Sequence, residues 1–350
     1  MDIPVLDHAP DERAENLRMI SESAAGLLQG DRRRARALRF SDPGFEHAKW
    51  AALAEMGWLM LRLPQADDGL GMGLSELCAI ARQTGRELVP EPVVMAALIA
   101  PALPLAARDD LLACRRILLP AFAQPSDPLP VLRDGRVSGR VRGIPMAAGA
   151  DGFLVQTGSG AALVDSGAAG MAIRLDPCHD GSKLGSLTLT DTPADTVATD
   201  MIRLREEAML ALAAELLGVA ETAFDLTLAY LKERRQFDKP IGAFQALQHS
   251  MVDLFMELSL MRATVGQAAT RLDDGATGDS AAAAVSVAKA RCTEGASRIT
   301  RAAIQLHGGI GYTDEADIGL YLRKAMVLGG LLGGEAFHRA RALSLAEAAQ

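Results

Sequence analysis

Three groups of residues in this sequence have the types and spacing that chemistry requires. Glu215 places a carboxylate inside the apolar segment Leu212–Gly218, where a charge is costly unless it is used or paired. A carboxylate in a dry pocket of this kind is suited to accept a proton. Arg234 carries a planar guanidinium that can grip a phosphate through two hydrogen bonds. Gln305 precedes a cluster of glycines, and backbone without a Cβ atom lets a diphosphate approach closely.

Each group also has a purely structural interpretation. Glu215 can form a salt bridge with an arginine of another segment. Arg234 falls near the C-terminal end of a long predicted helix, where the helix dipole favours a cation. Gly308 and Gly309 follow a helical run, as glycines that end helices commonly do. Two adjacent glycines and a third at position 311 exceed what a helix stop requires, which favours the binding interpretation.

The elements that position these residues fall into three segments. Apolar residues recur at helical spacing from about residue 10 to 115, with breaks at the glycine-rich segment 63–73 and at the prolines near 90. Residues 116–200 consist of short runs separated by Gly, Asp and Pro, which predict a small antiparallel β domain. The helical spacing then returns, and helices are expected near 203–234, 242–273, 279–307 and 315–346.

We therefore expect a mainly α protein with a small β domain. Its parts would be an N-terminal helical domain (1–115), a middle β domain (116–200) and a C-terminal four-helix bundle (201–350). A helix of about 30 residues spans roughly 45 Å, so the last block suits an antiparallel bundle that also forms subunit contacts.

Composition excludes several classes of function. The 350 residues carry 36 basic and 44 acidic side chains, a net charge of −8 without a run of like charges, so affinity for nucleic acid or anionic membranes is not expected. The N-terminus is polar and no run of 18 uncharged apolar residues occurs, so we expect a cytoplasmic protein. The cysteines lack metal-ligand spacing, and we expect reduced, buried thiols and no metal site; they are Cys78, Cys114, Cys178 and Cys292.

At several points the residues resemble the acyl-CoA dehydrogenase family. The segment Glu233–Gln245 is similar to the family signature "ER.QFG.PI..FQ", and Gln305–Thr313 is similar to "Q.HGG.G(Y/F)T". In the N-terminal block, Gly57–Gly71 resembles "GW…L…PE..GG.G", with Gln65 where glutamate is usual. Two C-terminal signatures on successive helices are more specific than either alone.

The resemblance implies FAD as the cofactor and an electron-transfer flavoprotein as the acceptor of its electrons. It implies that Arg234 holds the diphosphate or adenosine end of FAD and that Phe237 and Gln245 line the adenine. It also implies that the glycine signature contacts FAD seated in a neighbouring subunit, so that an oligomer is required. The implied cofactor-binding residues are Arg234, Gln236, Phe237, Phe244, Gln245, Gln305, Gly308 and Gly309.

The family's usual catalytic bases are missing from this chain. Leu332 stands where many members carry the glutamate that removes the α-proton, and Ala208 aligns with a second known location. Glu215 follows Ala208 by about two helical turns on roughly the same face. Members that act on bulky, steroid-like acyl-CoAs look similar there, with glutamate in an "AAE..G" context. Glu215 is therefore the candidate base, and Glu335 is the remaining alternative.

A second departure lies in the β domain. Family members usually carry "TEPG.GSD", whose backbone and hydroxyls hold the flavin ring, whereas Leu119–Pro128 contains no glycine and no Thr-Glu. Without glycine the same close backbone approach is not reproduced. We expect FAD-dependent α,β-dehydrogenation of an acyl-CoA, with a bulky or steroid-derived acyl group, by half of a hetero-oligomer of homologous chains. The alternatives are a self-sufficient homo-oligomer, a non-catalytic partner subunit, and a flavin oxidase or monooxygenase.

Overall fold

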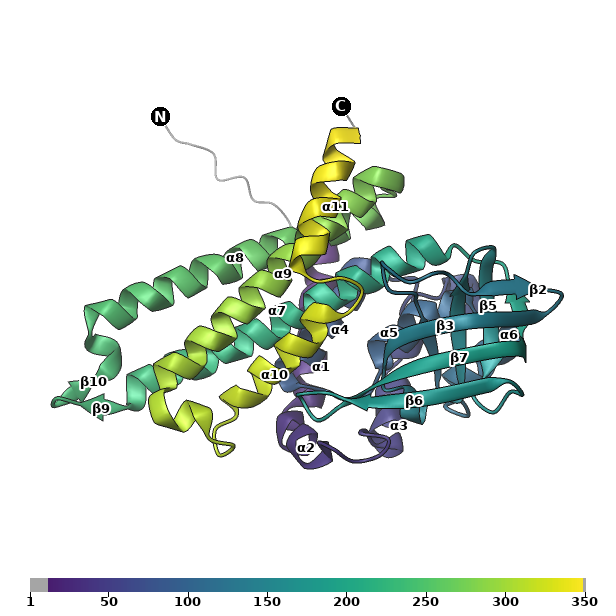
Figure 1. The fold of residues 1–350 in the computed structure, drawn as a ribbon. Coiled ribbons are helices and arrows are strands. Elements are labelled where there is room, and N and C mark those ends of the chain that lie inside the picture. The colour runs from purple at the N-terminus through teal and green to yellow at the C-terminus, as the bar shows by residue number, and fades with distance from the viewer. Residues whose placement is uncertain (1–11, 349–350) are drawn as a thin grey trace, which may run out of the picture.

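The computed structural model describes residues 12–348 and confirms the expected order of helices, a β domain and further helices (Figure 1). Residues 1–11 and 349–350, which belong to the expected first and last domains, lie outside the described residues, and so does most of the polar N-terminal segment on which the expectation about targeting rests. The N-terminal elements are α1 (Glu12–Leu28), α2 (Asp31–Leu38), α3 (His47–Glu55), η1 (Trp58–Met60), η2 (Gln65–Asp67), α4 (Leu74–Glu87), α5 (Val93–Ile99), η3 (Ala100–Ala102) and α6 (Leu105–Leu112).

The β domain contains two four-stranded sheets, with strand orders β1-β4-β5-β8 and β2-β3-β7-β6. The strands are β1 (Leu118–Ala121), β2 (Val131–Arg133), β3 (Arg136–Pro145), β4 (Gly152–Thr157), β5 (Gly160–Asp165), β6 (Met171–Pro177), β7 (Lys183–Pro193) and β8 (Asp195–Val197), with η4 (Ala147–Gly149) before β4. The expectation of purely antiparallel pairing is wrong for β1 and β4, which run parallel. The chain crosses to the other sheet between these two strands, and such a crossover returns it in the same direction.

The C-terminal block contains five helices rather than four. They are α7 (Met201–Glu233), α8 (Gln245–Asp273), α9 (Gly278–His307), α10 (Ile318–Gly330) and α11 (Glu335–Ala348). Between α7 and α8 lie the hairpin strands β9 (Arg235–Gln236) and β10 (Lys239–Pro240) and the short helix η5 (Ile241–Ala243). Between α9 and α10 lies η6 (Gly308–Tyr312). The expected helix at 315–346 is interrupted at residues 331–334. Two pairs of glycines surround Leu331 and Leu332, and glycine is a poor helix former.

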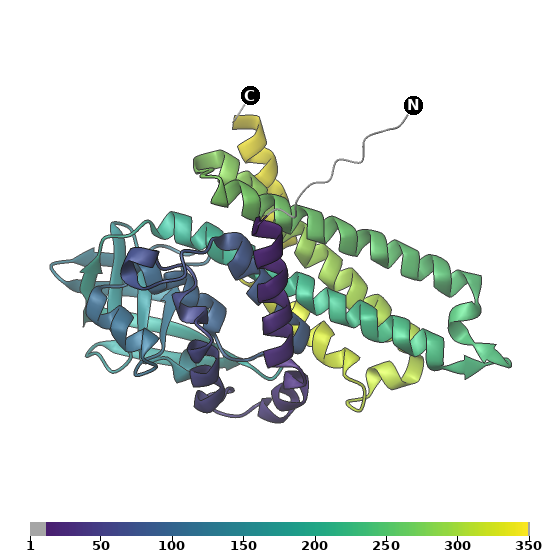
Figure 2. The same cartoon turned by 180° about the vertical axis from the view of Figure 1, so that it is seen from behind.

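Helix α7 joins the two ends of an elongated molecule (Figure 1). The β domain lies at one end, and the β9–β10 hairpin lies at the other. From behind, α1 is seen to cross the bundle (Figure 2), and it packs against α4. Helix α7 begins at Asp200, whose carboxylate accepts hydrogen bonds from the backbone N–H groups of Ile202 and Arg203, both at 3.0 Å.

Helices α4 and α7 cross at backbone distance. A Cβ atom at Gly85 would lie 2.1 Å from the carbonyl oxygen of Glu215, and one at Gly218 would lie 1.9 Å from that of Arg82. Both positions therefore require glycine, because any side chain would push the two helices apart. The crossing fixes where the middle of α7 lies relative to the N-terminal helices.

The same crossing buries a charge. The fully buried carboxylate of Glu221 accepts hydrogen bonds from Arg82 at 2.6 and 2.7 Å, from Arg86 at 3.1 Å and from Arg262 of α8 at 2.7 Å. Burial alone would raise the pKa of Glu221, but the arginines outweigh burial and lower that pKa. Three helices are thus tied together through one carboxylate.

Replacing this carboxylate should destabilise the protein. We expect Glu221→Gln to reduce the free energy of unfolding by about 3 kcal/mol at neutral pH, because a buried ion pair is broken and arginines lose their counter-charge. Since the native pKa of Glu221 is lowered, the stabilisation is fully present above the unfolded pKa of roughly 4.3 and is lost as pH falls from there through the lowered native pKa. Urea unfolding followed from pH 7 down into this acidic range measures both effects.

Asp225→Asn is the matched control, because Asp225 contacts Arg86 at 3.0 Å on the exposed side of the same crossing. An exposed pair contributes less than about 1 kcal/mol. Equal losses in the two variants would contradict the central position of Glu221.

Candidate active site

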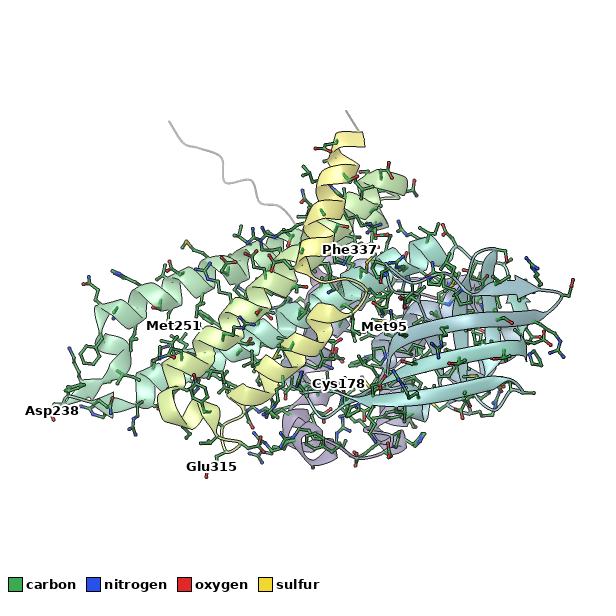
Figure 3. The ribbon with its side chains drawn as sticks, in the orientation of Figure 1. Met95, Cys178, Asp238, Met251, Glu315 and Phe337 are labelled. Carbon is green, nitrogen blue, oxygen red and sulfur yellow. The ribbon has the colours of Figure 1, made fainter. Side chains whose placement is uncertain are left out.

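Connected cavities lie where the helices meet the β domain. One of about 610 Å³, its opening to solvent included, is lined by Glu215 and Lys324. A second, apolar cavity of about 420 Å³ shares four lining residues with the first, which are Met95, Pro145, Leu212 and Leu331. Figure 3 places the labelled Met95 near this junction. The two cavities therefore adjoin, and together we call them the cleft, which is largely apolar and, among the described residues, has charged side chains only in the wall of the first cavity.

Glu215 is held at this cleft from two directions. Its backbone is fixed by the close approach of Gly85, and its carboxylate Oε1 lies 3.1 Å from the Nζ of Lys324 on α10. The salt bridge that we considered from sequence is therefore present, but the expectation of an arginine partner is wrong. Helix spacing gives the face of α7 on which Glu215 lies, whereas the partner depends on how α10 packs.

Glu215 is bound more loosely than the other carboxylates in the buried part of α7. Glu206 and Glu207 are each bound by arginine, the former by two nitrogens of Arg341 and the latter by Arg62 and Arg203. Glu215 has a single lysine contact and lines a cavity. A flexible ammonium holds a carboxylate less rigidly than a guanidinium fork does, so Glu215 keeps the accessibility that proton transfer requires.

Lys324 is stabilised in its charged form. Burial alone would lower the pKa of Lys324, but the charges of Glu215 and Asp180 outweigh burial and raise that pKa. Asp180 lies in the turn between β6 and β7, so the β domain supplies part of the charge around the bundle's lysine.

A loop held by buried polar groups closes the cleft. Leu332, with its backbone in the left-handed region at φ 54°, lines the apolar cavity where a carboxylate was expected in the family. The Nζ of the fully buried Lys289 donates to the carbonyl oxygens of Leu328, Gly329 and Gly333 at 3.2–3.3 Å. The Nε2 of His338 lies 3.2 Å from the carbonyl oxygen of Leu332.

These two groups escaped sequence reasoning. Burial lowers the pKa of Lys289 to about 8 and that of His338 to about 3, so the imidazole is neutral and its Nε2–H donates to the loop. The burial of Lys289 could have been suspected from sequence, because this lysine lies among the mostly small residues of Ala281–Cys292. The partners of His338 arise from the packing of α9, α10 and α11, which spacing does not reveal.

Glu335, the alternative base, lies at the start of α11. Its carboxylate pairs with Arg339 at 2.9 Å, one turn along the same helix. Among the described residues that line the two joined cavities, Glu335 does not occur. The geometry therefore favours Glu215 over Glu335.

The residues expected to bind FAD lie at the opposite end of the molecule. Arg234 ends α7 and is exposed, as are Gln236 and Gln245. Phe237 is 84% exposed and adopts φ 50° at the turn of the β9–β10 hairpin, whose tip Figure 3 marks at Asp238. A non-glycine residue with positive φ is strained, and such strain commonly accompanies function.

The second signature reaches the same end. His307 stacks on Tyr230 with ring centres 4.5 Å apart, which joins the end of α9 to the end of α7. Gln305, Gly308 and Gly309 are exposed, and a Cβ atom at either glycine would meet nothing within 4 Å. The structure thus brings the two signatures together, and an exposed aromatic group beside open backbone fits the adenosine diphosphate of a nucleotide cofactor.

Phe244 completes this surface. It is half-buried, its ring is edge-on to that of Phe237 at 6.0 Å, and the Nζ of Lys239 lies 4.2 Å from its ring centre. Glu215 and Arg234 are 19 positions apart on α7, which corresponds to roughly 28 Å at 1.5 Å per residue. The cleft and the tip of the bundle are therefore separate ends of one chain.

The β-domain loop uses its polar groups internally. The N–H of Ala123 donates to Gln156 at 3.2 Å, and the Nε2 of Gln124 donates to the carbonyl oxygen of Arg142 at 3.0 Å. The carboxylate of Asp127 also binds Arg142. These groups are bound within the domain, in agreement with a loop that differs from the family's flavin-ring segment.

Three further features bear on the expectations from sequence. The four cysteines are free thiols; Cys78 and Cys292 are buried, whereas Cys114 and Cys178 are half-buried. Within residues 12–348, no group of three or more His, Cys, Asp or Glu side chains is arranged to hold a metal ion. None of the described helices combines the length and apolar character needed to cross a membrane.

Comparison with known families covers both helical parts. Residues 14–109 match the model described as "Acyl-CoA dehydrogenase, N-terminal domain", and residues 201–343 match "Acyl-CoA dehydrogenase, C-terminal domain". Similar curated proteins include the acyl-CoA dehydrogenase IpdE2 of Mycolicibacterium smegmatis, 31% identical over 91% of this chain and 95% of that protein. IpdE2 of Mycobacterium tuberculosis is 32% identical, with coverage of 90% and 91%.

Solved structures agree. A variant of the Tcur3481-Tcur3483 steroid ACAD superimposes with a TM-score of 0.88 at 31% identity, covering 96% of this chain and 99% of that chain. The ChsE4-ChsE5 complex from Mycobacterium tuberculosis gives a TM-score of 0.86 at 26% identity, with coverage of 98% and 99%.

The cleft between bundle and β domain, together with these matches, defines a flavoprotein oxidoreductase. The chain belongs to the acyl-CoA dehydrogenase family. The resemblance inferred from its sequence, including that to the family's steroid-related members, is confirmed.

Proposed function

We propose that this chain is one half of a hetero-oligomeric, FAD-dependent acyl-CoA dehydrogenase. The reaction is α,β-dehydrogenation of a bulky, steroid-derived acyl-CoA, with electrons passed to an electron-transfer flavoprotein. The observation that carries the proposal is the separation of the two candidate half-sites, one at the middle of α7 and one at its C-terminal end, roughly 28 Å apart. Two solved relatives, one described as a steroid ACAD and one as a two-protein complex, support it.

The tip of the bundle binds the adenosine end of FAD in a neighbouring chain. Arg234 grips the diphosphate, Phe237 and Phe244 pack against the adenine, and Gln305 donates a hydrogen bond beside Gly308 and Gly309. This assignment is supported by the exposure of every one of these polar side chains and by the open space over the two glycines. Gln236 and Gln245 complete the polar rim.

The cleft performs the proton transfer. A bound flavin would supply the acceptor for the hydride that leaves the β-carbon of the substrate. Glu215 takes the α-proton onto its carboxylate, and the electron pair of the broken α-C–H bond forms the α,β double bond. The apolar walls, with Met95, Leu212 and Leu331 among them, exclude water and accommodate the acyl group.

The partner chain supplies the contacts to the flavin ring that the β domain of this chain does not reproduce. In a symmetric homo-oligomer every chain is identical, so each must carry both kinds of half-site. The loop around Ala123 and Gln124 is bonded internally, which supports a division of labour between unlike chains. The same loop favours the alternative of a non-catalytic partner subunit, in which Glu215 is a structural salt bridge.

A flavin oxidase or monooxygenase is a further alternative, favoured by Leu332 at the usual place of the base. Rapid reaction of the reduced flavin with oxygen indicates the oxidase. Reduction of a dye that depends on acyl-CoA indicates the dehydrogenase.

Glu215→Gln tests the base. In the assembled enzyme we expect this variant to keep its FAD and its acyl-CoA affinity but to lose at least about 100-fold in turnover, the usual scale for a general base. The matched control is Glu335→Gln, which should keep nearly full activity because Glu335 pairs with Arg339 away from the cleft. Near-normal turnover in Glu215→Gln would favour the non-catalytic alternative.

Arg234→Ala tests the proposed contact with the FAD diphosphate at the tip of the bundle. The substitution removes a charge-assisted contact of about 1.5–3 kcal/mol, so FAD affinity of the assembled enzyme should fall by roughly 10–150-fold. Titration of the flavin-free complex with FAD measures this change. Lys232→Ala, an exposed cation in the last turn of α7, is the control and should retain FAD. Unchanged affinity in Arg234→Ala means that the signature is structural here.

A further inference from the structure

Lys324 lies where three elements meet. Its helix α10 faces Glu215 on α7, and its side chain also lines an outer cavity with Asp180 and Ser182 of the β6–β7 turn. The inner cavity around Glu215 has these same three residues, Lys324, Asp180 and Ser182, in its wall. Lys324 is therefore paired with a carboxylate of the bundle, and a carboxylate of the β domain lies in the wall of the same two cavities.

Asp180 is fixed in place from its own turn. Its Oδ1 accepts hydrogen bonds from the backbone N–H of Ser182 at 3.0 Å and from the hydroxyl of Ser182 at 2.6 Å. It lines both cavities together with Lys324, and its charge helps to raise the pKa of that lysine. A preformed carboxylate is thus available to Lys324 besides Glu215.

The other charged groups around the two cavities are already bound. Arg36 and Arg39 of α2 line the outer cavity, and both pair with Asp314. Glu91 lines the inner cavity and is bound by Arg34 through both carboxylate oxygens. Cys178 near the turn is neutral, because burial raises the pKa of its thiol.

Proton uptake by Glu215 would change the balance of charges in this group. A neutral carboxyl no longer compensates the ammonium, and a buried charge without a counter-charge is costly. Lysine has a flexible four-carbon stem and a compact charge, so it can turn from one carboxylate to another, which a rigid guanidinium fork does less readily. Asp180 is the acceptor that the geometry offers.

We propose that Lys324 is a positioning residue whose charge is shared between Glu215 and Asp180. It holds Glu215 ionised and oriented before proton transfer and turns to Asp180 after Glu215 has taken up the proton. The inference rests on the proposed role of Glu215 as the base. It assigns the β6–β7 turn a role in positioning the base, although this turn is distant from Glu215 in the sequence.

The protonation of Glu215 can be measured on the purified chain without its partner. Glutamate is labelled with ¹³C at the carboxyl carbon, and the infrared band of the protonated carboxyl is followed as pH falls. Subtracting the titration of Glu215→Gln isolates the signal of Glu215. Because no turnover is needed, this readout does not depend on cofactor loading or on the identity of the acyl group.

Two variants should shift this titration in opposite directions. Lys324→Met removes a positive charge 3.1 Å from the carboxylate, so protonation of Glu215 should begin about 1–3 pH units higher. Asp180→Asn removes the second carboxylate, so Lys324 should interact with Glu215 alone. The midpoint of the Glu215 titration should then fall, by less than it rises in Lys324→Met. The amide oxygen of the new side chain can still accept the hydrogen bonds from Ser182. The control is Lys183→Met, a neighbouring lysine that pairs with Asp42 and should change nothing.

In the assembled enzyme the acidic limb of the pH–rate profile should follow the same two shifts. An unchanged titration in Lys324→Met overturns the proposal, and so does a shift in Lys324→Met with none in Asp180→Asn. Failure of the proposed function is distinct: it appears as full turnover in Glu215→Gln, whatever the infrared titration shows.

Discussion

A helix that is buried along most of its length cannot leave charges unpaired, and α7 carries carboxylates at Glu206, Glu207, Glu215 and Glu221. Each of these four carboxylates pairs with a cation of another segment. Arginines of α4, α8, α11 and the segment before α4 serve three of them, and Lys324 of α10 serves the fourth. Because these contacts join α4, α8, α10 and α11 to one axis, the position of α7 sets the positions of the cleft and of the distant tip. The glycine crossing with α4 makes that axis rigid where Glu215 lies.

The length of α7 separates the two candidate half-sites. The carboxylate of Glu215 in the middle of α7 and the guanidinium of Arg234 at its end belong to one helix, but they lie roughly 28 Å apart at different surfaces. In the proposed assembly, a cofactor seated against the cleft of one chain would be met by the tip of another, so assembly would be required for activity. The internal hydrogen bonds of the β-domain loop agree with a proposed division of the two tasks between unlike chains.

The order of helices and strands and the two C-terminal signatures could be predicted from sequence, because helical spacing, glycine breaks and the residues from Glu233 to Gln245 are local features. The expected cofactor residues also gather at one end of the structure. What sequence did not give depends on contacts between distant segments: the lysine rather than an arginine beside Glu215, the parallel pairing of β1 with β4, and the support of the loop at Leu332 by Lys289 and His338. The break between α10 and α11 was a local feature that the apolar spacing on either side of its glycines obscured.

The flavin content of the purified protein tests the division of the site most directly. The chain is expressed alone and together with a homologous chain encoded beside it, and bound FAD is counted against protein by absorbance after size separation. The account predicts a colourless or flavin-poor protein when the chain is alone and about one FAD per heterodimer when the two are co-expressed. A yellow homo-oligomer that carries one FAD per chain and oxidises acyl-CoA unaided would contradict it, and would mean that other backbone in the β domain holds the flavin ring.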